Sequence, residues 1–348
     1  MLFAKQKNQL GIDIGTSNIK LVELKPTEQG FVLNTYGIAN VSYSLAGKDS
    51  ASAITQAATV LKELMKRSGT TTTKAVASLP NNVVFTSVIE LPKIPENEMK
   101  KAIEFEAKKY VPLPLEEVAL SWSIVGDKNA VIKETGMRAS EDKQKILLTA
   151  VPTVVIDNYI KMFHLAGVTP QALEIEALAL IRSVVGEDVK SILLIDIGAK
   201  STSINLVDNN YLRLSKSLSV GGDTITNSLS QSLSVNFARA EQFKKDFGMT
   251  EEGSQIPHVI RPVLDLIKNE ASQLINLFES RGNVLGRVVF SGAGSRLPGL
   301  PEYFAGLGKP VSLANPWTRV VYPQDLKPVI NPLGINLAVA IGLAMRPN

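Results

Sequence analysis

Two stretches about half a chain apart share one pattern of apolar and polar positions. Residues 10–24 read LGIDIGTSNIKLVEL, and residues 193–207 read LLIDIGAKSTSINLV. Each has an apolar run, Asp-x-Gly, a short polar stretch and a second, alternating apolar run. This pattern predicts two strands joined by a tight turn. Glycine lets the turn approach a ligand closely, and neighbouring backbone N–H groups can form an anion-binding concavity there.

Either copy alone also fits an ordinary strand end, where the aspartate hydrogen-bonds to its own backbone. The repetition is more informative, because it predicts two related halves that face each other across a cleft. Each half would then offer a phosphate-binding turn, with an aspartate at its edge that can hold a divalent cation, usually through water.

The rest of the first half alternates strands and helices. Residues 31–41 and 74–79 are strand-like, and residues 52–67 repeat apolar side chains at helical spacing. This order predicts an α/β domain with a mixed sheet.

Residues 80–169 have a different sequence pattern, with proline-bounded strands and two amphipathic helices. The strands are expected at 82–91, 118–125, 145–151 and 169–174, and the helices at 95–110 and 153–165. We interpret this segment as a small inserted α/β domain.

The second half returns to the first pattern. A strand at 211–220 ends at Gly221-Gly222, and Asp223 or Thr224 can cap the helix that follows. A strand at 287–290 runs directly into SGAGS at 291–295, where glycines would let a flat base or ribose lie against the backbone. Helices are expected at 175–185, 237–247, 262–280 and 336–345, with a loop at 314–334.

Composition excludes several classes of function. The 348-residue chain has no cysteine, so disulfides, thiolate metal sites and a cysteine nucleophile are excluded. The net charge of +4 comes without a dense Lys/Arg block, so we expect no nucleic-acid partner. The N-terminus lacks a signal peptide, which predicts a cytoplasmic protein. No uninterrupted apolar run reaches about 18 residues, so we expect the membrane to be reached only through partners.

Four elements now stand in order: two Asp-x-Gly hairpins, a Gly-Gly turn before a helix, and a glycine-rich turn after a strand. With DIGTSNIKLVEL, DIGAKSTSINLV, VGGDTITNSLS, ARAEQFKKDFG, SGAGSRLPGLPEYF and NLAVAIGLAMR, the chain resembles the actin-like ATPase superfamily, and within it the PilM family of the FtsA/PilM branch. The resemblance covers nearly the whole chain. It implies an α/β, actin-like (ribonuclease H-like) two-lobed ATPase fold with an FtsA/PilM-type small inserted α/β domain.

The resemblance also implies a division into domains. Residues 1–79, 170–188 and 335–348 would form the first lobe, and residues 80–169 the inserted domain. Residues 189–334 would form the second lobe, with a helical subdomain at about 223–282.

ATP and Mg²⁺ are the cofactors implied. From the first lobe, the β- and γ-phosphates would be cradled by Gly15, Thr16, Ser17 and Asn18, with Lys20 adding charge. From the second lobe, they would be cradled by Gly198, Ala199, Lys200, Ser201 and Thr202. Asp13 and Asp196 would hold Mg²⁺ through water. The α/β-phosphates and ribose would meet Gly221, Gly222 and Asp223. Ribose or adenine would meet Glu241, Lys244 and Lys245, and the floor of the adenosine pocket would be Gly292, Ala293, Gly294 and Arg296.

Relatives that hydrolyse ATP orient the attacking water with a Glu or Gln before the second hairpin. Glu176 lies in that region, with Glu174 as a second choice. The alternative for Glu176 is an acid at a helix start, facing the positive end of the helix dipole. We expect an ATP-binding protein that is at most a slow ATPase.

The implied role is a cytoplasmic ATP-binding scaffold of type IV pilus assembly, or of a related type II secretion system. It would lie peripheral to the inner membrane and bind the cytoplasmic N-terminal peptide of a PilN-like protein. That peptide would lie between the first lobe and the inserted domain, with 82–110 as the expected region. Further pilus platform or motor proteins and a homo-oligomer remain open as partners.

Two other functions remain open. An FtsA-like cell-division protein would polymerise at the membrane through a C-terminal amphipathic helix, which the last residues, Met345-Arg-Pro-Asn, do not suggest. A metabolic kinase of the same superfamily would need a catalytic aspartate in a substrate cleft, and no sugar motif is apparent.

Overall fold

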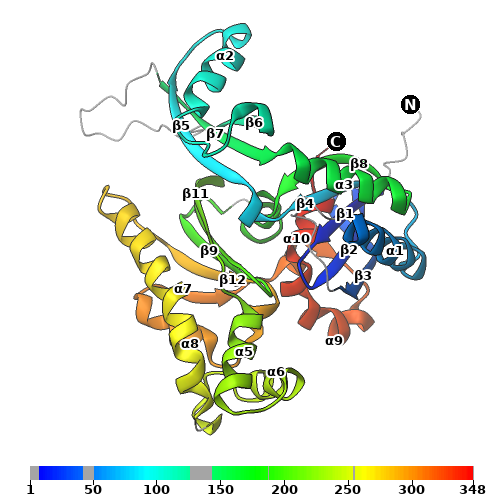
Figure 1. Cartoon of the computed structure of the whole chain (residues 1–348), viewed down its shortest axis with the longest axis vertical. Coiled ribbons are helices and arrows are strands. Elements are labelled where there is room, and N and C mark those ends of the chain that lie inside the picture. Colours follow the sequence, from blue (N-terminus) through cyan, green and yellow to red (C-terminus); the bar gives the residue numbers. More distant parts are fainter. Residues whose placement is uncertain (1–7, 42–50, 126–142, 187, 254, 348) are drawn as a thin grey trace.

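In a computed structural model of the chain, residues 8–41, 51–125, 143–186, 188–253 and 255–347 are described. Their strands form sheets of six, five and three strands. In Figure 1 the six-stranded sheet lies on the right, the five-stranded sheet on the lower left, and the three-stranded sheet at the top.

The first sheet begins with an antiparallel meander. Its strands are β1 (Gln9–Ile14), β2 (Asn18–Thr27) and β3 (Gly30–Asn40). β4 (Lys74–Leu79) pairs parallel with β1, and β8 (Thr169–Ile175) pairs parallel with β4. The sheet has two apolar faces: Ile19 and Leu21 of β2 belong to one, and Val22 and Leu24 of β2 to the other. One packs on α1 (Ala51–Ser68) and α3 (Thr153–Ala166), and the other on α10 (Gly334–Ala344).

The second sheet repeats this plan. β9 (Ile192–Ile197), β10 (Thr202–Asp208) and β11 (Tyr211–Leu218) are antiparallel neighbours, and β12 (Arg287–Ser291) pairs parallel with β9. β13 (Val311–Leu313) pairs parallel with β12. The core on one face of this sheet is completed by α5 (Gly222–Ser232), α6 (Phe237–Asp246), α7 (Ile256–Glu279) and α8 (Leu300–Phe304). The duplication seen in the sequence is therefore a duplication of sheet topology.

The third sheet has the order β5-β7-β6 and is antiparallel throughout. Its strands are β5 (Phe85–Pro92), β6 (Val118–Val125) and β7 (Lys143–Pro152), and α2 (Glu96–Ala107) covers one face. Ile89, Ile103 and Ile146 form the centre of this separate core. In the chain it lies between β4 and β8 of the first sheet.

Two helices carry the contact between the large sheets. The apolar side chains of α4 (Glu176–Leu180) and α10 share one core with β9, β10 and β12. The packing is close, since a Cβ on Gly342 would lie 1.8 Å from the carbonyl oxygen of Ala179. A π-helical turn at Ile181–Val185 directly follows α4. α4 and α10 therefore hold the two lobes about a shared core.

Among the described residues, one helical stretch, Gln324–Ala344, is long and apolar enough to cross a membrane by length and composition. It consists of short pieces, including α9 (Lys327–Ile330), before α10. Every residue of α10 except Asn336 is buried. We therefore read α10 as a core helix.

Two sequence expectations differ from the structure. Residues 314–334, expected as a loop of the second lobe, contain β14 (Val320–Val321), which pairs with β3 of the first sheet. Trp317 and Ile330 pack there with α10, because their apolar side chains complete that core. Residues 314–334 are therefore not one continuous loop, and the domain boundaries stay predictions. α7 begins at Ile256 instead of Pro262, because Pro257 occupies the first turn, where proline is tolerated.

Candidate functional site

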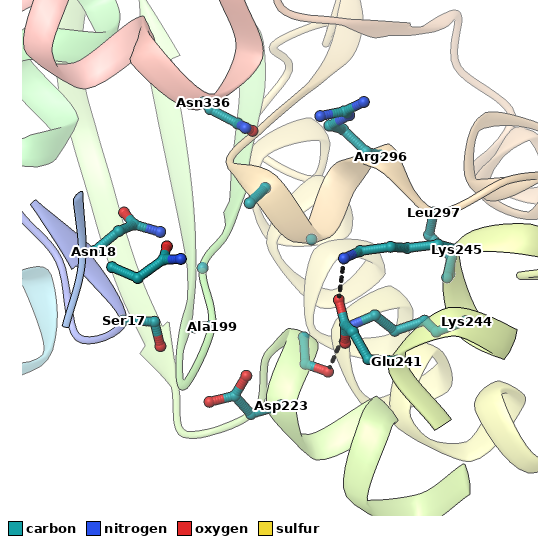
Figure 2. A pocket seen from close by; sticks show the side chains of 15 residues that line it. Ser17, Asn18, Ala199, Asp223, Glu241, Lys244, Lys245, Arg296, Leu297 and Asn336 are labelled. Carbon is teal, nitrogen blue, oxygen red and sulfur yellow. Dashed lines mark hydrogen bonds and ion pairs between the residues drawn. The ribbon is translucent and has the colours of Figure 1, made fainter. Parts of the chain in front are cut away.

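A cleft lies where the two hairpin turns approach each other. Its wide part has a volume of about 590 Å³, and a narrower part of about 80 Å³ continues inward. Ser17 and Asn18 line both parts from the first lobe, and Gly198 and Ala199 line both from the second. In Figure 2 the first-lobe side chains face Asp223, Glu241 and the lysines across the wide part. The turns of the two repeated hairpins therefore line one cavity.

The two hairpin turns close in the same way. The backbone N–H of Gly15 donates to the carbonyl of Asn18, and that of Gly198 donates to the carbonyl of Ser201, both at 2.9 Å. The two central residues of each turn lie outside the pairing of the hairpin's strands. Of these central residues, Thr16, Ser17 and Ala199 line the cavity, as an anion-binding turn requires, and Lys200 does not.

Asp13 stands at the carboxyl end of β1 and is only 2 % exposed. Lys20 lies directly opposite in the β1–β2 register, and its Nζ is 2.8 Å from Asp13 Oδ2. Ser78, at the end of β4, donates to Asp13 Oδ1 at 2.8 Å. The buried carboxylate is therefore held by one cation and one hydroxyl.

Glu176 and Asp196 join Asp13 and Lys20 around the narrow part of the cleft. Burial, with the nearby charges of Asp13 and Asp196, raises the pKa of Glu176 well above its usual range, although Lys20 opposes the shift. Burial also raises the pKa of Asp196, with Lys20 opposing and Asp13 adding to the shift. Burial alone would lower the pKa of Lys20, but Asp13, Asp196 and Glu176 raise it. Three carboxyl groups and one ammonium thus leave an excess of negative charge that a cation would balance.

Lys244 forms hydrogen bonds to the first turn of α5. Its Nζ donates to Gly222 O at 3.1 Å and to Thr226 Oγ1 at 2.8 Å, and it pairs with Glu241 Oε2 at 2.6 Å. Lys245 is 65 % exposed and reaches Glu241 Oε1 at 3.3 Å. The two neighbouring lysines therefore differ: Lys244 is mostly buried and hydrogen-bonded to α5, and Lys245 is exposed and contacts Glu241 at longer range.

The glycine-rich turn after β12 lies against the second hairpin. Gly292 has φ +83°, and a Cβ there would lie 2.4 Å from Ile197 O and 2.9 Å from Asp196 Oδ1. A Cβ on Gly294 would lie 2.4 Å from Ile197 Cγ2. Only glycine permits this close approach, and it brings Ala293 and Arg296 to the wall of the wide part.

Most residues proposed from the sequence line this cleft. They are Asp13, Gly15, Thr16, Ser17, Asn18, Lys20, Glu176, Asp196, Gly198, Ala199, Ser201, Gly222, Asp223, Glu241, Lys244, Lys245, Gly292, Ala293, Gly294 and Arg296.

Three proposed residues are not among the lining residues of either part: Lys200, Thr202 and Gly221. Thr202 is fully buried and donates to Val220 O at 2.8 Å, so it joins β10 to the turn before α5. Gly221 precedes α5, and its N–H donates to Thr224 Oγ1 at 3.1 Å. Glu174, the second choice for catalysis, forms a two-pronged ion pair with Arg182 and is committed to it.

Sequence reasoning missed several lining residues, among them Asn40, Asn81, Leu297 and Asn336. Asn81 had a readable signal: Pro80-Asn81 follows a strand that pairs parallel with β1, and ligands of such sheets gather at the carboxyl ends of their strands. Asn336 had none, because its position depends on how α10 packs.

Among the described residues, no three His, Cys, Asp or Glu side chains are grouped so that they could enclose a metal ion. Asp13 and Asp196 could therefore hold Mg²⁺ only with waters and phosphate oxygens completing the shell, which is the usual habit of this cation.

A separate cavity of about 300 Å³ borders the region expected to bind a peptide. Asn82, Phe85 and Tyr110 line it from the inserted unit, and Lys216 lines it from β11. It thus opens toward the second lobe, whereas the sequence-based expectation placed the peptide groove against the first lobe.

Two sheets of repeated topology that enclose one cleft define the actin-like ATPase fold. MreB 5 of Spiroplasma citri, solved with AMPPNP, is similar over 97 % of this chain and 94 % of its own, with a TM-score of 0.51 and 14 % identity, and this likeness concerns the fold. More narrowly, residues 11–348 match the family described as type IV pilus assembly protein PilM, and the chain belongs to this family.

Individual relatives agree with the family. A chain of a PilM–PilN type IV pilus biogenesis complex is similar over 98 % of this chain and 100 % of its own, with a TM-score of 0.84 and 25 % identity. The cell division protein FtsA of Streptococcus pneumoniae is 25 % identical over 255 residues, which are 68 % of this chain. The match spans only 55 % of FtsA, so the alternative of an FtsA-like protein has less support.

Proposed function

We propose that this chain is an ATP-binding scaffold of type IV pilus assembly that binds the N-terminal cytoplasmic segment of a PilN-like inner-membrane protein. The observation that carries the proposal is the similarity, over nearly the full length of both chains, to a chain of a PilM–PilN complex. The chain would lie in the cytoplasm and reach the inner membrane through this partner.

The cleft supports the nucleotide part of the proposal. Its wide part has room for a nucleoside, and its narrow part is bounded by both hairpin turns. The phosphates would lie between Ser17 and Ala199, close to Lys20. The base and ribose would lie between Gly294, Arg296 and Glu241.

Mg²⁺ would sit near Asp13 and Asp196, held through water. The excess of carboxylates supports this position, because burial and then mutual repulsion raise the pKa of Glu176 and Asp196, and a divalent cation there would favour their ionised forms. A cation bound there would compete with Lys20 for Asp13, which would leave the Lys20 ammonium available to a phosphate.

Glu176 is the proposed base or water-orienting group for hydrolysis. It lines the narrow part, where the terminal phosphate would lie. Burial and like charges raise the pKa of Glu176 and favour its protonated form, which cannot act as a base. A cation that balances those charges would lower the pKa and favour the carboxylate that can accept a proton from water. We therefore expect slow hydrolysis of ATP, which would change the bound state of the scaffold and would not serve to turn over a substrate.

The peptide would dock on the inserted unit within 82–110. Exposed aromatic side chains support this region: Phe85 is 37 %, Tyr110 48 % and Phe105 68 % exposed. Extended peptides commonly bind at such surfaces through a few side-chain pockets. Nucleotide between the lobes would bias their closure and thus the neighbouring groove.

Calorimetric titration with a synthetic N-terminal peptide of the PilN-like partner tests the proposal. We expect saturable 1:1 binding in the presence of Mg²⁺ and ATP, weakened by Tyr110→Ala. Val329→Ala is a matched control, because Val329 is similarly exposed at 57 % but lies on α9. Absence of binding with ATP present would count decisively against the scaffold role, and filaments with ATP in electron micrographs would favour the FtsA-like alternative.

A further inference from the structure

Asn81 occupies a position that the four sequence motifs do not include. It follows Pro80 directly after β4 and begins a 3₁₀ turn at Asn81–Val83. β4 lies between β1 and β8 in the first sheet, and both neighbours pair parallel with it. The carboxyl ends of these three strands therefore bring Asp13, Asn81 and Glu176 to one edge, and all three line the narrow part of the cleft.

The side-chain amide of Asn81 has an unpartnered hydrogen-bond donor. Its Nδ2 is buried and has no hydrogen-bond partner among the described residues. Buried donors without a partner are few in native proteins, and each one costs folding free energy. Such a group at a ligand site is explained most simply by an acceptor that arrives with the ligand.

The neighbours of Asn81 restrict what that acceptor can be. Asp13 is already engaged by Lys20 and Ser78, Glu176 already accepts a hydrogen bond from the backbone N–H of Asn81, and the ionised form of Asp196 repels an anion. Asn81 is neutral and donates, so it can approach an anion that the carboxyl groups reject. The narrow part has about 80 Å³, which admits a phosphoryl group but not a nucleoside. A phosphate oxygen accepts hydrogen bonds and donates none, so it fits both the space and the unpartnered donor of Asn81.

We propose that Asn81 is a specificity-determining residue that donates from Nδ2 to the terminal phosphate of the bound nucleotide. This inference rests on the proposed binding of ATP and adds a consequence to it. The wide part holds the nucleoside and the hairpin turns hold the inner phosphates of any adenine nucleotide. Contact with Asn81 requires the third phosphate, so the site distinguishes a nucleoside triphosphate from a diphosphate.

The position of Asn81 also transmits this distinction. Asn81 lines the cavity between the inserted unit and β11 as well as the narrow part of the cleft. Its turn connects β4 to β5 of the inserted sheet. A hydrogen bond to the third phosphate therefore fixes the segment through which the inserted unit is attached.

Binding of ATP and of ADP, each with Mg²⁺, to the wild type and to Asn81→Ala tests the inference by calorimetry. We expect Asn81→Ala to lower the ATP affinity about tenfold or more, as for the loss of one hydrogen bond to a charged group, with ADP affinity unchanged within twofold. Asn81→Asp should lower ATP affinity further, because a carboxylate repels the third phosphate. Asn82→Ala is the matched control, since Asn82 lines only the other cavity and is exposed.

The thermal midpoint of the nucleotide-free Asn81→Ala variant should equal or exceed that of the wild type, because the variant removes an unpartnered buried donor. If Asn81→Ala leaves the ratio of ATP to ADP affinity unchanged, whether both affinities stay the same or both fall equally, the inference is overturned. A wild type that binds neither nucleotide would instead contradict the proposed function. The two failures are thereby distinguished.

Discussion

Lys244 and Lys245 are neighbours in sequence, but we expect their replacement to have different effects on stability and nucleotide binding. Replacing each by methionine tests this expectation. Methionine keeps most of the side-chain volume and removes the charge. Lys244 is 12 % exposed and contacts Gly222 O, Thr226 Oγ1 and Glu241. Lys245 forms an ion pair with Glu241 at 3.3 Å and is 65 % exposed.

The expected costs follow from these contacts. Lys244→Met removes two charge-assisted hydrogen bonds and leaves Glu241, which is 27 % exposed, without its near cation. Such losses amount to about 2–4 kcal/mol of unfolding free energy. Lys245→Met removes one exposed ion pair, worth about 0–1 kcal/mol. Because Lys244 also fixes the first turn of α5, the first variant should weaken nucleotide binding even without touching the ligand.

Urea denaturation of both variants gives the stability difference, and calorimetry with Mg²⁺ and ATP gives the affinity. Burial alone would raise the pKa of Glu241, but hydrogen bonds from Lys244 and Thr226 lower it. A lowered folded-state pKa stabilises the fold above the unfolded value, near 4.5, and this stabilisation is lost as the pH falls through the folded value. The cost of Lys244→Met should therefore shrink below about pH 4.5. Equal costs for the two lysines at pH 7, or a cost independent of pH, would refute this reasoning.

Three further predictions concern the same cleft. Asp13→Ala and Asp196→Ala should each weaken binding of Mg²⁺ and ATP by about 1–3 kcal/mol, measured by calorimetry, and unchanged affinity in both would refute the cation position. Glu176→Gln should abolish phosphate release and stabilise the nucleotide-free protein. Burial and like charges raise the folded-state pKa of Glu176, so its ionisation costs stability as the pH rises above the unfolded value near 4.5. The difference in thermal midpoint between Glu176→Gln and the wild type should therefore widen as the pH rises from about 4.5, and a constant difference would contradict this. Gly292→Ala should lower stability by about 2 kcal/mol or more, because φ is +83° and its Cβ would collide with Ile197 O. An undisturbed thermal midpoint would mean that the turn can relax.

Local pattern was enough to predict the repeated hairpins and the strands around them. Each hairpin is stabilised by contacts within fifteen residues, and the alternation of apolar side chains fixes which face is buried. The pairing of Asp13 with Lys20 follows from the same register. The actin-like fold and the PilM family, expected from the resemblance, are confirmed by the comparisons.

Contacts distant in sequence were beyond the reach of local pattern. β14 has two residues and depends on β3, nearly three hundred positions earlier, so residues 314–334 look like a loop. Asn336 and Asn81 face the cleft only because α10 and β4 pack where they do. Lys244 and Lys245 are identical as letters, and the fold alone assigns one to the wall and the other to solvent. The roles proposed for these residues stay predictions.

Calorimetric titration of the wild type with Mg²⁺ and ATP, beside the Asp13→Ala, Asp196→Ala double variant, tests most directly that one nucleotide is held between the two hairpins. We predict one site per chain in the wild type and an affinity at least tenfold weaker in the double variant, as expected for the loss of two charge-assisted links. No binding by the wild type, or equal binding by both proteins, would contradict the account.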